Sequence, residues 1–110
     1  MNAEFRDKIR GSQIAGAAGD ALRYTVEFTS PSGICAQYGQ GGIREYELDR
    51  AFGTAFISDD TQMTLFTANS LLRQEGYPEK RTPECWIYAG YTDWLGTQSP
   101  SRIAPKVCWV

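Results

Sequence analysis

Histidine is absent from this sequence of 110 residues. Its absence removes the commonest general base of enzymes, the Ser-His and Cys-His nucleophile systems, and most zinc sites. Long apolar runs are also missing, because no stretch approaches the roughly 18 apolar residues that indicate a membrane-spanning helix. Chemistry in this chain must therefore use carboxylates, hydroxyls or metal ions bound through oxygen.

Cysteines are few and scattered. Cys35, Cys85 and Cys108 are the three present, and no two of them form a CxxC pair. An odd, scattered set without a signal peptide favours reduced thiols and a cytoplasmic location over a disulfide framework. We expect all three to be small buried apolar side chains.

Charge is balanced and evenly distributed. The chain carries 11 basic and 13 acidic residues, with a net charge of −2. No basic stripe indicates nucleic acid as a partner, and no apolar span indicates a membrane. The length fits at most one small domain.

Apolar residues recur at helical spacing in several segments, and no series of alternating strands is present. We expect helices over residues 4–18 (ending near residue 22), over residues 59–74, and from Thr82 through Leu95. The pattern predicts a mainly α fold. The apolar residues 107–110 end the sequence without a polar terminus, which predicts that residues 1–110 form a single partial domain.

Other segments are expected to be irregular. Residues 29–55 contain two turn signals and should be mostly loop, whereas Thr25, Val26 and Phe28 favour extended backbone. Small residues in the first helix should let another helix approach closely. The apolar side chains of residues 63–72 and the aromatic side chains of the last helix should be mostly buried.

Ser58, Asp59 and Asp60 open the second expected helix and are called the Ser-Asp-Asp triplet below. A serine followed by two acids is an ordinary helix start, because the hydroxyl caps a backbone N–H and the macrodipole favours anions. Three oxygen-bearing side chains at one helix end can also contact magnesium, although the dipole opposes a cation and further ligands must come from elsewhere. Local physics favours the cap and leaves the metal half-site open.

Glu27 lies between two apolar residues, Val26 and Phe28. Glutamate is usually exposed, so its side chain is expected to point to water. The alternative is a carboxylate directed into a cleft.

Two motifs together resemble the ADP-ribosylglycohydrolase family. Arg10–Leu22, which ends in Gly-Asp-Ala-Leu, looks like the opening motif of this family, and Thr25–Phe28 is similar to the segment that follows it. Ser58–Met63, Ser-Asp-Asp-Thr-Gln-Met, resembles the first metal motif of the family. Where the family usually has glycine after Gly-Asp-Ala-Leu, this chain has Arg23.

The resemblance implies an all-α bundle, a pair of magnesium ions and cleavage of the bond between C1″ of ADP-ribose and an acceptor. It implies that Ser58, Asp59 and Asp60 are metal ligands and that Glu27 is a catalytic residue near the scissile ribose. The metals would orient ribose hydroxyls and activate a water. The substrate would be an ADP-ribosylated protein or a small molecule that contains ADP-ribose.

The second metal motif of the family, Asp-x-Asp-Thr, has no counterpart after Asp93. The chain is therefore expected to be the N-terminal portion of a longer domain, inactive alone and open to completion by a C-terminal fragment.

Two alternatives remain. One is a non-catalytic helical module that binds a partner through Trp94, Trp109 and Val110. The other is a decayed relative in which the triplet is only a cap.

Overall fold

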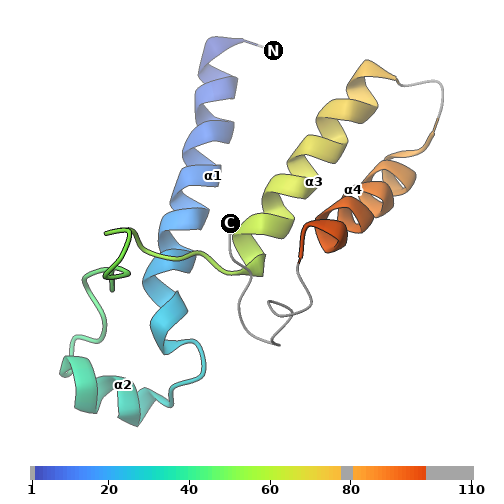
Figure 1. The fold of residues 1–110 in the computed structure, drawn as a ribbon. Helices are drawn as coiled ribbons and strands as arrows, with labels where there is room; N and C mark the ends of the chain where they lie inside the picture. Colours follow the sequence, from blue (N-terminus) through green and yellow to red (C-terminus); the bar gives the residue numbers. More distant parts are fainter. Residues whose placement is uncertain (1, 78–80, 99–110) are drawn as a thin grey trace. The chain divides into compact units, whose positions relative to one another are not determined.

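The computed structural model describes residues 2–77 and 81–98, and these residues form an all-α structure without strands (Figure 1). The elements are α1 (Ala3–Arg23), the 3-10 helix η1 (Tyr24–Val26), α2 (Pro31–Tyr38), α3 (Asp59–Gly76) and α4 (Pro83–Thr97). The all-α prediction is confirmed. No helix among the described residues combines the length and apolar character that crossing a membrane requires.

The chain divides into two compact units, Met1–Ile57 and Ser58–Val110. The first unit contains α1, η1, α2 and a long loop, and the second contains α3 and α4. Each unit is described by itself below.

Helix α1 starts at a side-chain cap and ends in a tighter turn. The Asn2 Oδ1 atom accepts a hydrogen bond from the Phe5 backbone N–H at 2.8 Å. The predicted end near residue 22 is confirmed, but the extended backbone expected at Thr25 and Val26 is wrong, because these residues continue as η1. Val26 is buried in this conformation, and burial outweighs the weak strand propensity of a β-branched side chain.

Helix α2 lies inside the stretch expected to be loop, so that prediction is wrong over Pro31–Tyr38. Ser30 Oγ accepts from the Gly33 backbone N–H at 3.2 Å, and Pro31 occupies the first turn. Serine followed by proline is a helix start as well as a turn signal, because proline lacks the N–H that the first turn leaves unpaired. The helix ends at Gly39, whose φ of 82° favours glycine.

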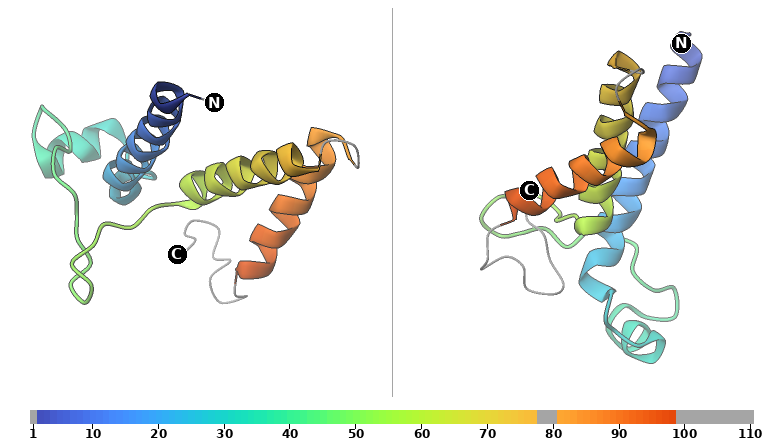
Figure 2. Two further views of the ribbon diagram at one scale, coloured as in Figure 1. Left: turned by 90° about the horizontal axis from the view of Figure 1, so that it is seen from above. Right: turned by 90° about the vertical axis from the view of Figure 1, so that its right-hand side faces the viewer.

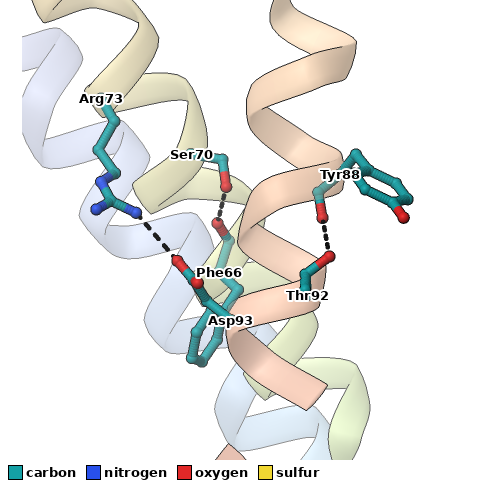
Figure 3. Close-up of polar contacts among 6 residues, drawn as sticks. All are labelled: Phe66, Ser70, Arg73, Tyr88, Thr92 and Asp93. Atoms are coloured by element: carbon teal, nitrogen blue, oxygen red, sulfur yellow. Dashed lines mark hydrogen bonds and ion pairs between the residues drawn. The ribbon is translucent and has the colours of Figure 1, made fainter. Parts of the chain in front are cut away.

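Helices α3 and α4 form the second unit, with α4 returning alongside α3 (Figure 2). They approach closely at Gly90, where a Cβ atom would overlap Ser70 Oγ and lie 3.2 Å from the Phe66 carbonyl oxygen. Ser70 is 2% exposed, and its hydroxyl donates to that same carbonyl at 2.7 Å (Figure 3). The small residues Ser70 and Gly90 thus let α3 and α4 approach closely.

Polar contacts join the two helices on either side of this crossing. The Thr67 and Tyr91 hydroxyls lie 2.8 Å apart, and Arg73 Nη1 donates to Asp93 Oδ2 at 3.2 Å (Figure 3). The Arg73–Asp93 pair is exposed, so it stabilises the hairpin by at most about 1 kcal/mol. The crossing therefore depends mainly on the small residues at its centre.

Several burial predictions are wrong. Leu65, Leu71 and Leu72 are exposed because α4 covers only one face of α3. Tyr88 is 77% exposed on the opposite side of α4, whereas Trp86 and Trp94 are half-buried.

The cysteine prediction also fails in part. Cys35 is half-buried and Cys85 is exposed, both as free thiols. Cys108 and the expected contact residues Trp109 and Val110 lie outside the described residues.

Candidate functional site

The Ser-Asp-Asp triplet lies at the start of α3, and the predicted cap is confirmed. Ser58 has extended backbone, and its Oγ atom accepts from the Asp60 backbone N–H at 3.1 Å. The hydroxyl is fully buried, Asp59 is half-buried and Asp60 is exposed. The cap therefore brings one hydroxyl and two carboxylates to a single helix end.

The chemistry of this donor set fits magnesium but does not complete a site. Hydroxyl and carboxylate oxygens are hard ligands, and magnesium is commonly held by one or two carboxylates together with waters. Among residues 2–77 and 81–98, no group of three or more Asp, Glu, Cys or His side chains gathers as a metal cluster. The triplet would therefore hold a cation only with waters or other oxygens in the remaining positions.

A buried glutamine lies one turn further along α3. Gln62 is 4% exposed, and its backbone N–H donates to the Ser58 carbonyl at 3.4 Å. Its Oε1 atom accepts from Trp94 Nε1 at 2.9 Å and from Gln98 Nε2 at 3.2 Å. These contacts tie the first turns of α3 to the end of α4.

This network was not predicted from the sequence. A signal was nevertheless present, because Gln62 follows Ser58 at helical i, i+4 spacing and therefore shares its face of the helix. The partners Trp94 and Gln98 lie more than thirty positions away, and nothing local pairs them with Gln62.

Glu27 follows η1 in the first unit. Its Oε1 atom lies 3.4 Å from Arg23 Nη2, and the side chain is 20% exposed. The expectation of a fully solvated glutamate is therefore wrong, since the carboxylate is largely covered and paired with a cation. Arg23 was noticed as a departure from the family pattern but not as a partner for Glu27.

The structure thus brings three of the four predicted site residues together. Ser58, Asp59 and Asp60 are consecutive residues at the start of α3, whereas Glu27 belongs to the other unit. In the same unit as Glu27, the Tyr24 and Phe56 rings pack with centroids 6.2 Å apart.

One carboxylate at another helix start has a perturbed pKa. Hydrogen bonding from the Thr82 side chain, and then from the Glu84 backbone, lowers the pKa of Glu84 below its ordinary value. Glu84 lies in the first turn of α4 and is exposed. This is the behaviour of a stabilising helix start, and it gives Glu84 no part in the candidate site.

Comparison with known proteins identifies the family. The model of the ADP-ribosylglycohydrolase family matches residues 1–109. No curated protein and no solved structure matches the chain. The match covers nearly the whole sequence, including the triplet, Glu27 and both structural units, and the chain therefore belongs to the ADP-ribosylglycohydrolase family.

Proposed function

We propose that this chain contributes to magnesium-dependent hydrolysis of the bond between C1″ of ADP-ribose and an acceptor. The observation that carries the proposal is the cap at Ser58, which puts one hydroxyl and two acidic residues in the first turn of α3. This donor set occurs in a chain that the family matches over residues 1–109. The substrate would be an ADP-ribosylated side chain or a small molecule that contains ADP-ribose.

The residues at the start of α3 would bind the cation. Asp59 and Asp60 would bind the cation through their carboxylates, while the Ser58 hydroxyl holds the first turn and offers a further oxygen. When bound, magnesium supplies positive charge that orients substrate oxygens and makes a bound water more acidic.

Glu27 would serve as the proton carrier. Its carboxylate would accept a proton from the water that adds to C1″ and then return it to the departing acceptor. For this to happen, the Glu27 oxygen that faces Arg23 must either contact Arg23 and the water together or lose its contact with Arg23. A single 3.4 Å contact to a half-exposed guanidinium is weak enough for that exchange.

Magnesium titration by isothermal calorimetry tests the metal assignment. We expect the unsubstituted chain to bind magnesium weakly and Asp59→Asn and Asp60→Asn to weaken binding further, because each removes an anionic ligand. Glu75→Gln is the matched control, since Glu75 is an exposed carboxylate in the last turn of the same helix. Absence of heat at millimolar magnesium would leave the triplet as a helix cap alone.

Hydrolysis itself is tested by release of free ADP-ribose from ADP-ribosyl-arginine and ADP-ribosyl-serine. Glu27→Gln should abolish any release that the chain supports, whereas Glu4→Gln, a change in the first turn of α1, should not. Release that is unchanged by Glu27→Gln would remove this residue from the proposed mechanism.

A second candidate is a non-catalytic helical module. Exposed apolar side chains on α3 and α4, including Leu65, Leu72 and Tyr88, favour it. Trp94, expected as a contact residue, is instead half-buried and donates to Gln62. A monomer in sedimentation that does not bind the dye ANS would contradict this candidate.

A further inference from the structure

The amide orientation of Gln62 is determined by its partners. An indole N–H can only donate, so the atom 2.9 Å from Trp94 Nε1 must be the amide oxygen of Gln62. A second donor, Gln98 Nε2, contacts the same oxygen at 3.2 Å. Because both contacts are to the oxygen, the other amide atom of Gln62 is the nitrogen, and this assignment follows from the donors rather than from a choice between O and N.

That nitrogen is buried and has no hydrogen-bond partner. The Gln62 residue is 4% exposed, and Nε2 is one of the buried side-chain atoms without a partner among the described residues. A buried donor left unpaired costs about 1–3 kcal/mol, so an oxygen acceptor at this position would stabilise the protein.

The position of Gln62 relates this donor to the triplet. Side chains of an α-helix lean toward its N-terminus, so a side chain covers the turn before its own Cα atom. Gln62 lies one turn after Ser58, and both residues are buried on the same face of α3. Its side chain therefore extends over the turn that carries Asp59.

We propose that Gln62 is a ligand-binding residue whose amide nitrogen donates to an oxygen atom of the ligand held at the Ser-Asp-Asp triplet. Trp94 and Gln98 act as positioning residues that hold the amide with its nitrogen toward that oxygen. The inference rests on the proposed function, because it needs a ligand at the start of α3. The ligand chemistry is an oxygen acceptor, supplied by a water on the cation or by ADP-ribose itself.

Side-chain amide resonances of the ¹⁵N-labelled 110-residue chain test this directly without any substitution. We expect the Gln62 NH₂ pair to shift on addition of magnesium chloride, or of magnesium chloride with ADP-ribose. A shift with magnesium alone assigns the acceptor to a cation-held water, and a shift only with ADP-ribose assigns it to the substrate. The NH₂ pair of Gln74, about three turns further along α3, should not move.

The backbone amides of Ser58, Asp59 and Asp60 separate the two possible failures. If they shift while the Gln62 NH₂ pair does not, the metal assignment stands and the role of Gln62 is overturned. If neither set shifts, the metal assignment fails and the role of Gln62 fails with it. Gln62→Met should also weaken binding of the ligand that shifts the Gln62 pair, magnesium or ADP-ribose, about fivefold, the effect of losing one hydrogen bond, whereas Gln74→Met should not.

Discussion

Arg23 and Glu27 form an ion pair across the end of α1 and η1, with Nη2 and Oε1 3.4 Å apart. The glutamate side chain is 20% exposed and the arginine side chain 48%. The predicted catalytic carboxylate therefore belongs to a largely buried side chain that is ion-paired with a residue four positions earlier. The contact also depends on η1, because the i, i+4 approach needs helical rather than extended backbone between the two residues.

The first prediction concerns the strength of this pair. Arg23→Gln should lower the free energy of unfolding by only about 0.3–0.5 kcal/mol, because the pair is partly exposed and its order, cation before anion, is the less favourable one. Urea unfolding at low salt measures this change in the free energy of unfolding, and about 1 M salt should remove most of the difference between Arg23→Gln and the unsubstituted chain. Lys8→Gln is the control, since Lys8 and Glu4 form a more exposed i, i+4 pair. A loss above about 2 kcal/mol would show that Arg23 has a structural role beyond this contact.

The second prediction concerns the crossing of α3 and α4. Gly90→Ala should destabilise the protein by about 1–3 kcal/mol, because the new Cβ atom would overlap Ser70 Oγ and crowd the Phe66 carbonyl. Gly96→Ala is the matched control in the same helix. Its Cβ atom meets nothing within 4 Å, so it should stabilise α4 by up to about 1 kcal/mol. Thermal unfolding of both variants measures the difference, and equal effects would contradict the close crossing.

Cap chemistry explains which parts of the fold were predictable. Ser58 and the Thr82-Pro83 pair marked the starts of α3 and α4 correctly, because a helix start is specified by a few adjacent residues. The start of α2 uses the same chemistry at Ser30 and Pro31, but those residues equally favour a turn. Only packing with the rest of the chain decides between the two outcomes.

The contacts that shape the candidate site were not predictable for a different reason. Gln62 contacts Trp94, and Ser70 lies against Gly90, in each case between two helices and between positions far apart in the sequence. Such pairs depend on the crossing position of α3 and α4, which a single sequence does not specify. The Arg23–Glu27 pair was missed because the intervening residues were assigned to extended backbone.

The third prediction separates the two functions of Ser58. Ser58→Ala should cost about 1 kcal/mol of stability because the cap to the Asp60 N–H is lost, whereas Ser58→Gly should cost only a few tenths. Both variants lack the hydroxyl oxygen, so both should bind magnesium more weakly by a similar factor. Circular dichroism melting and magnesium calorimetry on the same samples give the two quantities. If Ser58→Ala instead loses more magnesium affinity than Ser58→Gly, in parallel with its larger loss of stability, the hydroxyl acts only as a cap.

The fourth prediction concerns pH and rests on Glu84. Hydrogen bonding from the Thr82 side chain, and then from the backbone, places the folded-state pKa of Glu84 below the ordinary value of 4.5. The carboxylate form is therefore favoured in the folded protein, and the stabilisation is fully present above pH 4.5 and is lost as pH falls through the lower folded-state pKa.

Melting temperatures measured between neutral pH and about pH 3 test this dependence. Glu84→Gln should reduce the loss of stability on the acid side, because it removes the proton uptake that accompanies unfolding there. Thr82→Val should have a similar effect, since it removes the largest cause of the lowered pKa while leaving Glu84 in place. If Thr82→Val leaves the acid limb of the curve unchanged, the hydroxyl of Thr82 does not stabilise the Glu84 carboxylate. The start of α4 would then depend on Pro83 and on the interaction of Glu84 with the helix dipole.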